Sequence, residues 1–552
     1  MNKVCEHCVV EYQVTDDDLE FYDKLKIPSP GFCPECREIR RLTWRNENNF
    51  YSRKCDLCGK DIISVFSPDK PYKVYCNKCW WSDHWDPLSY GTDFDFSRPF
   101  FEQFMELHRR VPQLTMMNDN GVGSENCEYC QDFAFGKDCY LVTGGWHIRG
   151  SLYSNMCNHV EDVVDCSSIN VKSELVYEST NSIELYSCAF LSLSSNCNDC
   201  YFGTDLKGCR HCFMCVGLRN KEFHIFNTPY SKEEYYNKIA GFDMSSYQGL
   251  EALKKQFEEF HAKFPRKAFS QVNCENCIGD NLYNCRETIG FDVFNAEFCK
   301  YVSRCDSPKN SYDLWQSGNP QWCCDCVTVD NSYETCFSIW CWKDKNIFYS
   351  DNCHSSGNLF GCVSLKRENY CILNKKYTKQ EYEILRAKIV EHMKKTGEWG
   401  EFFPSKLSPF CYNEALVQDF YPLSKEQTLK DGYKWKEENS KSYKPQTFEI
   451  PDKVADTSDN ILKELLACSK CSCNFKITPL EFKFHKRMGI AIPRHCPTCR
   501  RLERANRCNK IKLWDRNCDK CGNEMLAVLP NPTNTKKIRV YCEKCYLEEV
   551  IS

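Results

Sequence analysis

The chain has 552 residues, a formal net charge of −4, and a composition that is 42% apolar and 27% charged. A soluble chain of this length needs more than one core, and we expect three to five structural units. No stretch approaches the roughly 18 apolar residues of a membrane helix, and the start "MNKVCEHC" leaves no room for a signal region, so we expect a cytoplasmic protein that does not enter the membrane.

Cysteine is the compositional outlier, with 43 residues. In a long chain without a signal region, cysteines spaced as Cys-x-x-Cys favour reduced thiols and bound metal over disulfides. The predicted N-terminal module, residues 1–86, contains four such pairs: Cys5/Cys8, Cys33/Cys36, Cys55/Cys58 and Cys76/Cys79. Two pairs complete one closed tetrahedral thiolate site, so this module is expected to hold two structural zinc ions.

Short helices are expected between these pairs. Thr15 and Asp18 have the spacing of a capping box, in which each side chain satisfies a backbone N–H at a helix start. Arg37, Arg41 and Arg45 follow the second pair at helical spacing. They could contact phosphates, but for this copy we favour a solvated helix face that forms ion pairs with neighbouring glutamates.

A helical connector is predicted over residues 87–123. A helix over 97–110 places Phe100, Phe104, Leu107 and the following Val111 on one face. Just before it, "CWWSDHWD" contains Trp80, Trp81 and Trp85. Tryptophans beside a knuckle usually pack a zinc module onto its neighbour; stacking on nucleic-acid bases is the alternative.

The middle of the chain is an internal duplication. "NCEYC" at 126 returns as "NCENC" at 273, and the same offset relates Cys215 to Cys362 and Tyr235 to Tyr382. Two homologous units are therefore predicted over 124–270 and 271–400. Short apolar stretches alternate with polar turns, and cysteines recur at intervals near nine, which is typical of a β-solenoid. We expect coils of roughly 18 to 24 residues.

The central cysteines have three interpretations: small buried side chains, additional metal ligands, or thiols with a redox role. A free cysteine behaves as a small apolar side chain that suits a narrow stacked interior, and this is the interpretation we favour. One alternative is additional metal binding by the dense clusters "CRHCFMC" and "CCDC", which contain Cys209, Cys212, Cys215, Cys323, Cys324 and Cys326.

Capping helices are expected at the end of each solenoid unit. Ser231 with Glu234, and Thr378 with Glu381, form capping boxes, and a further amphipathic helix is predicted over 249–265. Helices here would cover the unpaired strand edges of a solenoid. Residues 401–460 are predicted to be a linker.

The C-terminal module, residues 461–552, repeats the N-terminal one. Its pairs are Cys468/Cys471, Cys496/Cys499, Cys518/Cys521 and Cys542/Cys545, and Thr478 with Glu481 repeats the capping box. In both modules 24 residues separate the first and second pairs and 18 separate the second and third. We expect successive pairs to share an ion, giving about four zinc ions in all. Pairing of Cys33/Cys36 with Cys55/Cys58, or an interleaved arrangement, stays open.

The two modules differ in charge. Residues 461–552 hold 19 Lys and Arg against 9 Asp and Glu, whereas residues 1–86 hold 13 against 15. Basic side chains at helical spacing can follow a phosphate backbone. The candidate nucleic-acid-binding residues are Arg500, Arg501, Arg504, Arg507, Lys510, Lys512 and Arg516.

Known catalytic motifs are missing, so an enzyme is the less favoured interpretation. There is no complete Gly-x-Gly-x-x-Gly, no His-Glu-x-x-His and no Gly-x-Ser-x-Gly. Glu161, Asp162 and Asp165 could be read as the carboxylates of a polysaccharide-cleaving solenoid. We interpret them instead as turn residues.

Long segments resemble a known family. "CPECREIRRLTWRNE", "DKPYKVYCNKCWWSDHWDPLSYGTDFDFSRPFFEQF" and "LRNKEFHIFNTPYSKEEY" are similar to zinc-ribbon, cysteine-rich proteins of ultrasmall candidate-phyla bacteria, some of which carry an automatic CaiB/BaiF label. The resemblance covers nearly the whole chain and implies bound zinc and a cytoplasmic setting. It gives no catalytic residue, and nothing in this chain supports CoA-transferase chemistry.

The predicted fold class is mainly β with α: duplicated cysteine-rich β-solenoid units with capping helices, bracketed by duplicated double zinc-knuckle modules. The favoured function is a zinc-binding scaffold whose basic C-terminal module contacts RNA or another polyanion. One alternative is a metal or thiol buffer that uses the central cysteines. The other is a protein–protein scaffold in which zinc is purely structural and the arginines pair within the protein.

Overall fold

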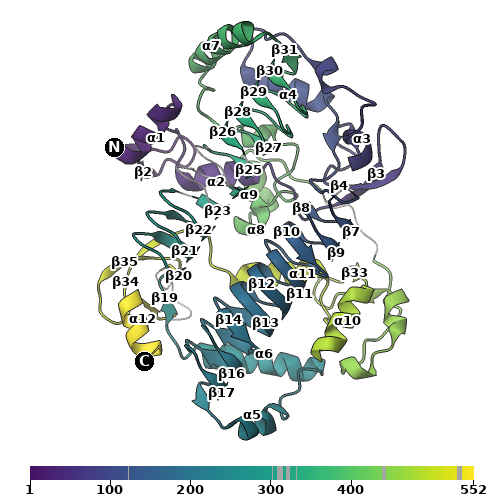
Figure 1. Cartoon of the computed structure of the whole chain (residues 1–552), viewed down its shortest axis with the longest axis vertical. Coiled ribbons are helices and arrows are strands. Elements are labelled where there is room, and N and C mark those ends of the chain that lie inside the picture. Colours follow the sequence, from purple (N-terminus) through teal and green to yellow (C-terminus); the bar gives the residue numbers. More distant parts are fainter. Residues whose placement is uncertain are drawn as a thin grey trace. The chain divides into compact units, whose positions relative to one another are not determined.

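The computed structural model describes residues 1–121, 123–300, 302–306, 315–318, 324–330, 332–437, 443–530 and 538–551. The chain forms two compact units, each assembled from parts that are far apart in the sequence (Figure 1). Unit 1 contains Met1–Met117 and Gln271–Lys436; unit 2 contains Asn118–Ser270 and Glu437–Ser552. The N-terminal module therefore shares a unit with the second solenoid, and the C-terminal module shares a unit with the first.

Unit 1 combines the N-terminal module, the connector helix and the second solenoid. The elements up to the connector are β1 (Asn2–Val4), β2 (Glu11–Gln13), α1 (Asp16–Leu25), α2 (Pro34–Leu42), β3 (Tyr51–Lys54), β4 (Asp61–Ser64), β5 (Val74–Tyr75), α3 (Asn77–Trp80), η1 (Pro87–Tyr90), α4 (Phe100–Arg110) and β6 (Gln113–Leu114). The solenoid strands are β20 (Gln271–Val272), β21 (Ile278–Tyr283), β22 (Ile289–Phe294), β23 (Val302–Asp306), β24 (Trp315–Gly318), β25 (Val327–Asp330), β26 (Tyr333–Cys336), β27 (Ile339–Trp342), β28 (Lys345–Phe348), β29 (Gly357–Phe360), β30 (Asn369–Ile372) and β31 (Lys375–Lys376). The closing helices are α7 (Lys379–Thr396), η2 (Ser405–Leu407), α8 (Val417–Phe420) and α9 (Lys425–Lys430).

Unit 2 combines the first solenoid with the C-terminal module. The solenoid strands are β7 (Glu125–Glu128), β8 (Gln131–Ala134), β9 (Lys137–Tyr140), β10 (Thr143–Arg149), β11 (Asn158–Val164), β12 (Ser167–Tyr177), β13 (Thr180–Ser192), β14 (Ser195–Asn198), β15 (Tyr201–Thr204), β16 (Arg210–Val216), β17 (Glu222–Ile225) and β18 (Thr228–Pro229). They are followed by α5 (Lys232–Ile239), α6 (Tyr247–His261) and β19 (Arg266–Lys267). The module contains η3 (Val454–Asp456), η4 (Asp459–Lys463), β32 (Leu466–Ala467), β33 (Asn474–Phe475), α10 (Pro479–Met488), α11 (Pro497–Arg507), β34 (Trp514–Asn517), β35 (Glu524–Ala527), β36 (Val540–Tyr541) and α12 (Glu543–Val550).

The predicted fold class is confirmed, because both central units are parallel β-solenoids. Strands of successive coils pair in parallel, as in Cys127 opposite Cys139 and Ile183 opposite Ser195. The usual step is 12 residues, with 13 at Ser167↔Thr180 and 11 at Ile278↔Ile289. The expected coil of 18 to 24 residues was therefore wrong. The cysteine spacing near nine reflects a three-residue repeat, described next, and carries no information on coil length.

The coil is short because the backbone turns at every third residue. Asn126, Tyr129, Asp132 and Phe135 all have positive φ, between 53° and 57°, and the pattern continues along both solenoids. Such left-handed residues are rare outside glycine, although Asn and Asp tolerate them best. Four such corners close a coil. The residue after each corner points inward; Cys127, for example, has no exposed surface.

The interior is lined by small side chains that donate hydrogen bonds to the coil backbone. Cys139 Sγ donates to Lys137 O at 3.3 Å and to Ile148 O at 3.6 Å. Serine does the same work elsewhere: Ser154 Oγ donates to Leu152 O at 2.9 Å and accepts from Cys166 N at 3.1 Å. A buried carbonyl needs such a donor, and a thiol or hydroxyl on one carbon fits the narrow interior. The interpretation of the central cysteines as small buried side chains is confirmed for the first solenoid, where each of them is buried.

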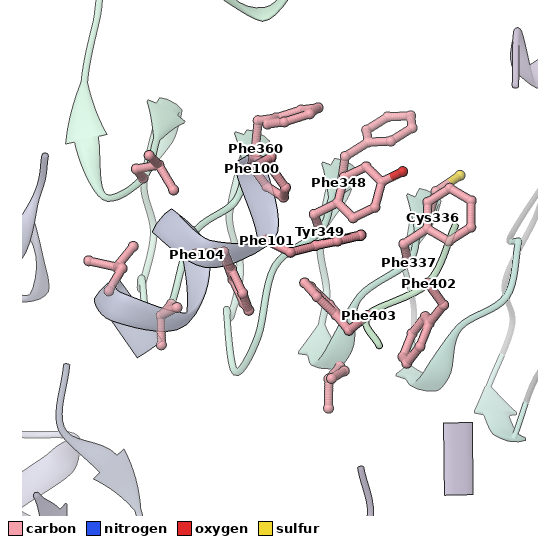
Figure 2. Packing of buried hydrophobic residues seen from close by; sticks show 14 of the residues in the cluster. Phe100, Phe101, Phe104, Cys336, Phe337, Phe348, Tyr349, Phe360, Phe402 and Phe403 are labelled. Atoms are coloured by element: carbon pink, nitrogen blue, oxygen red, sulfur yellow. The ribbon is translucent and has the colours of Figure 1, made fainter. Parts of the chain in front are cut away.

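The predicted connector helix is confirmed as α4, which packs on the outer wall of the second solenoid (Figure 2). The rings of Phe100 and Phe360 lie 5.3 Å apart, and those of Phe104 and Phe403 lie 4.6 Å apart. All four side chains are fully buried. The helix therefore supplies a second hydrophobic layer outside the coil.

The four predicted capping boxes are present. They lie at Thr15, Ser231, Thr378 and Thr478, where hydroxyl and carboxylate bond the reciprocal backbone groups. The helix predicted over 249–265 is α6. The local signals thus placed these helix starts correctly.

Candidate metal centres

Sixteen cysteines gather into four groups, and within each group all four sulfur atoms lie within 4.8 Å of one another. Each group joins successive pairs of one module. The groups are Cys5, Cys8, Cys33 and Cys36; Cys55, Cys58, Cys76 and Cys79; Cys468, Cys471, Cys496 and Cys499; and Cys518, Cys521, Cys542 and Cys545. Neither Cys33/Cys36 with Cys55/Cys58 nor an interleaved arrangement is found.

The local fold of each centre follows from its two pairs. The second pair begins a helix in every case, with Cys33, Cys76, Cys496 and Cys542 as N-cap residues. Helix N-termini favour negative charge, so they suit thiolates. The backbone also contributes: Cys496 N donates to Cys468 Sγ at 3.2 Å, and Cys33 N donates to Cys5 Sγ at the same distance.

These donors lower the pKa of individual thiols. Burial raises the pKa of Cys468, but N–H donors from Cys496, Cys471 and Lys470 outweigh it and bring the pKa to about 6. The same balance brings the pKa of Cys518 to about 6. A thiol that ionises this readily is prepared to bind a metal, because the thiolate is the ligand.

Four convergent thiolates form a site suited to a tetrahedral soft metal ion. With all four positions filled by protein, no position is left for a substrate. The arrangement therefore fits a structural ion. Among the residues that the structure describes, no other group of this kind occurs. Cys209, Cys212 and Cys215 do not form one, and Cys323 of "CCDC" lies outside the described residues.

Two arginines of the α11 stripe, Arg500 and Arg504, do not face solvent, so they do not form the exposed phosphate-binding surface predicted for them. Arg500 and Arg504 are 7% and 1% exposed, and both form ion pairs with Asp165 of the first solenoid. Arg500 Nη2 also lies 2.9 Å from Glu481 Oε1, and Arg504 Nη2 donates to Tyr153 O at 2.7 Å. Both guanidinium groups therefore already have a carboxylate partner, and little of either side chain is exposed for contact with a phosphate.

The remaining candidate residues are divided. Arg516 is buried and lies 2.8 Å from Asp519 Oδ2, so it too cannot face a phosphate. Arg507 is 46% exposed at its side chain and pairs with Glu178 at 3.0 Å. Arg501 and Lys512 are half-buried, and Lys510 is exposed.

The N-terminal module repeats the arginine contact in unit 1. Arg40 Nη2 lies 2.9 Å from Asp325 Oδ2, and Arg41 pairs with the other oxygen of the same carboxylate. Asp325 is a corner residue of the second solenoid, with φ of 41°, just as Asp165 is a corner of the first, with φ of 55°. Burial raises the pKa of Asp325, but Arg41, Arg40 and Arg37 outweigh it and lower the pKa below its usual value.

The two acceptor aspartates were missed as partners of the arginines. Asp165 was correctly interpreted as a turn residue, but nothing local marks it as an arginine acceptor. The only sequence signal was its corner position, since Asp is one of the few residues that tolerate positive φ. The favoured interpretation of these arginines as a solvated helix face that pairs with neighbouring glutamates is wrong for Arg41, which is buried and pairs with Asp325 of the solenoid. Arg45 is also buried, and it does pair with the neighbouring Glu47.

Trp80 packs the second N-terminal centre onto the second solenoid, as expected. It has no exposed surface, and its ring lies 5.5 Å from that of His354. Lys366 Nζ lies 4.7 Å from the Trp80 ring centroid and 4.8 Å from that of Trp85. Trp81 remains 47% exposed.

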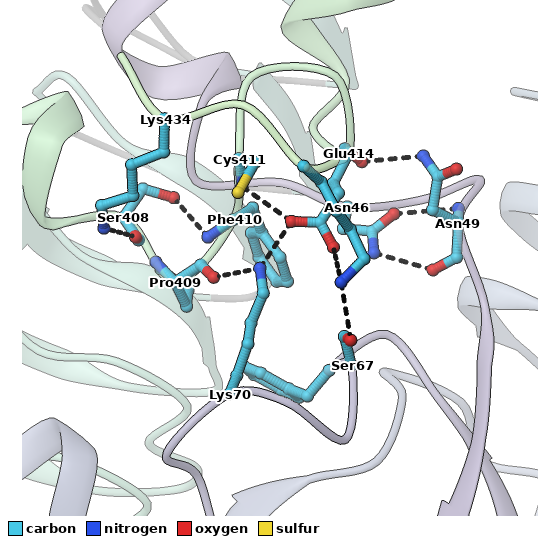
Figure 3. Close-up of polar contacts among 12 residues, drawn as sticks. Asn46, Asn49, Ser67, Lys70, Ser408, Pro409, Phe410, Cys411, Glu414 and Lys434 are labelled. Atoms are coloured by element: carbon cyan, nitrogen blue, oxygen red, sulfur yellow. Dashed lines mark hydrogen bonds and ion pairs between the residues drawn. The ribbon is translucent and has the colours of Figure 1, made fainter. Parts of the chain in front are cut away.

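The segment after α7 also contacts the N-terminal module, through the buried Glu414 (Figure 3). Its carboxylate accepts from Lys70 Nζ at 2.6 Å and from Tyr51 Oη at 2.6 Å. Asn49 Nδ2 donates to Glu414 O at 2.9 Å. Burial raises the pKa of Glu414, but Lys70 outweighs it and lowers the pKa overall. Residues of the predicted linker 401–460 thus take part in holding the N-terminal module in unit 1.

No protein-family model and no curated protein matches the chain. Among solved structures, a "putative acetyltransferase" from Desulfovibrio desulfuricans G20 aligns with 50% of this chain and 80% of its own, at 10% identity and a TM-score of 0.10. A superposition this poor carries no argument about function. Within the described residues, no helix is long and apolar enough to cross a membrane.

Proposed function

We propose that the chain is a β-solenoid scaffold stapled by four structural zinc ions, in which each ion orients a helix that locks a terminal module onto a solenoid. The observation that carries this proposal is that one helix brings together the cysteines of a candidate metal centre and the arginines that contact the solenoid. In α11, Cys496 and Cys499 belong to a metal centre, and Arg500 and Arg504, which follow directly, are paired with Asp165.

Zinc fits the donor set better than other common ions. Four thiolates in a closed site suit Zn²⁺, which prefers tetrahedral sulfur ligands and undergoes no redox chemistry. Bound zinc would fix the first turn of α11 and so aim the arginines at Asp165. The resemblance to zinc-ribbon proteins, and a reducing cytoplasmic setting in which the thiols stay free, agree with this proposal.

Contact with RNA has less support than an internal role for the arginines. Arg500, Arg504 and Arg516 are engaged by carboxylates and buried, so the surface left for phosphates is Lys510, Arg507 and their surroundings. The charge excess of residues 461–552 still favours a polyanion over a neutral partner. We therefore place the scaffold role first and polyanion binding second.

The metal content can be counted directly. Native mass spectrometry of the full chain, with elemental analysis, should show four zinc ions. A count clearly above four would favour the thiol-buffer alternative, and a count of zero would contradict the proposal.

The stapling role needs a separate experiment. A protease site inserted after the exposed Gly121 would cut the N-terminal segment from the chain. Only noncovalent contacts would then hold it, namely the ion pairs and hydrogen bonds with Asp325 and Glu414 and the aromatic packing of α4. We expect the cut fragment to co-elute with the remainder while zinc is bound and to separate after chelation. Separation of the fragment with zinc bound would contradict the proposal that zinc holds the N-terminal segment in place. Retention of the fragment after complete removal of zinc would contradict it too.

A further inference from the structure

The four knuckles share one backbone turn, which allows them to be compared. The residue after the second cysteine has positive φ in each: 62° at Val9, 73° at Gly59, 61° at Ser472 and 76° at Gly522. Its N–H donates to the carbonyl of the first cysteine in each, as in Val9 N to Cys5 O at 3.0 Å. The turn therefore demands a left-handed residue at this position.

Valine is the worst suited of these four residues to that turn. Its β-branched side chain clashes with the backbone at positive φ, whereas glycine does not. The strain is not offset by burial, because Val9 is 75% exposed, and its neighbours Val10 and Val4 are 59% and 54% exposed. The three valines form an exposed apolar tip, and exposed apolar surface of this kind is typical of contact sites.

The helices next to the first knuckle of each module carry opposite charges at equivalent positions. The offset of 463 residues that relates Cys33 to Cys496 also relates Asp17 to Leu480, Glu20 to Lys483 and Asp23 to Lys486. All six of these side chains are exposed. Helix α1 is thus acidic where α10 is basic, and α10 adds an exposed leucine.

We propose that the N-terminal module of one copy docks onto the C-terminal module of a second copy of this chain. The apolar tip Val4, Val9 and Val10, with the acidic face of α1, meets Leu480 and the basic face of α10. A second copy is the occupant that the charges favour, because both complementary surfaces occur in one chain. Such a head-to-tail contact closes into a dimer when both ends engage and otherwise extends the assembly.

The proposal is tested by sedimentation of the zinc-loaded full chain from micromolar to near-millimolar concentration. We expect concentration-dependent association that weakens at high salt. The charge reversal Glu20→Lys/Asp23→Lys should weaken association about tenfold or more, and Lys483→Glu/Lys486→Glu should do the same. Combining all four substitutions restores opposite charges and should restore association.

Two further variants separate this contact from folding and from general charge effects. Val9→Asn relieves the backbone strain, because asparagine tolerates positive φ, yet it should weaken association. Glu258→Lys/Glu259→Lys changes two exposed glutamates on α6 and should leave association unchanged. A chain that stays monomeric throughout overturns the proposal, as does a quadruple variant that fails to recover. If the chain stays monomeric and binds single-stranded RNA, and Lys483→Glu/Lys486→Glu abolishes that binding, then α10 is a polyanion-binding surface instead.

Discussion

Arg504 Nη1 lies 2.6 Å from Asp165 Oδ1, although 339 residues separate the two in the sequence and neither side chain is appreciably exposed. The carboxylate is shared with Arg500, and Arg504 also donates to the backbone of Tyr153. A buried charge is stable only when its partners are complete. The contact therefore makes the C-terminal module and the first solenoid depend on each other.

Removing the carboxylate should destabilise unit 2 strongly. Asp165→Asn leaves two buried guanidinium groups without their shared counter-ion, and we expect a loss of about 3–5 kcal/mol in the free energy of unfolding. Asp325→Asn should have the corresponding effect in unit 1, where Arg40 and Arg41 lose their shared carboxylate and Arg40 keeps only Glu401. Urea unfolding followed by circular dichroism measures both.

The matched control is Arg507→Ala on the same helix. Its side chain is 46% exposed, and its partner Glu178 keeps Lys254 as a second partner, so the expected cost is about 0–1 kcal/mol. Equal losses in the free energy of unfolding for Asp165→Asn and Arg507→Ala would show that the buried ion pair stabilises the unit no more than the exposed one.

Substituting one cysteine should remove one metal ion only at the terminal centres. Cys471→Ser deletes a ligand from an exposed position, where serine itself disturbs little packing, and should lower the zinc count by one. Cys212→Ser changes an inward residue of the first solenoid, whose thiol donates to Arg210 O, and should leave the count unchanged. Native mass spectrometry distinguishes the two. A loss of metal in Cys212→Ser would revive the thiol-buffer alternative.

The sequence predicted the parts of this fold that depend on local chemistry. Cysteine pairs at matched intervals identified the four candidate metal centres, and Thr–x–x–Glu spacings identified helix starts such as that at Thr478. The 147-residue offset identified two solenoids. Each of these signals lies within a short window or repeats at a fixed distance.

What the sequence did not predict depends on contacts between distant segments. The coil length was wrong because inward residues recur every three positions, and cysteine, serine, valine and leucine share these positions without a clear pattern. The arginines of α11 have the spacing of a phosphate-binding stripe, and only the position of Asp165 in space shows that they are engaged. Likewise, no short sequence motif shows which terminal module packs on which solenoid.

Replacing Asp344 with serine should stabilise unit 1 at neutral pH. Asp344 points into the second solenoid between Ser332 and Ser356, accepts from Ser356 N, and its Oδ2 has no hydrogen-bond partner among the described residues. Burial raises its pKa well above the usual value. A raised pKa means that its contribution to stability is present below about pH 4 and is lost as pH rises through the folded-state pKa.

Serine fits this position because it occupies the equivalent positions one coil before and one coil after. We expect Asp344→Ser to gain about 1–3 kcal/mol at pH 7, the usual cost of a buried polar atom without a partner. The gain should shrink as pH falls toward 4. Urea unfolding of both proteins at pH 7 and pH 4.5 measures it; a destabilised variant at pH 7 would mean that the carboxylate is paired.

Acid should destabilise unit 2 partly through His485. This imidazole is fully buried in α10 and donates from Nδ1 to Ile490 O at 3.3 Å, and its Nε2 has no hydrogen-bond partner in the described residues. Burial, aided by the nearby Arg500, lowers its pKa to about 3. Because the unfolded chain takes up this proton near pH 6.5, the stabilising contribution is complete above pH 6.5. It is lost as pH falls toward 3, by about 1.4 kcal/mol per pH unit.

His485→Phe removes the titrating group and replaces it with a ring like that of Tyr22, its equivalent in the N-terminal module. The free energy of unfolding should therefore fall between pH 6.5 and 5 by about 2 kcal/mol less in the variant than in the parent chain, with acid loss of metal common to both. Parallel pH profiles for the two proteins would show that His485 does not titrate as a buried group.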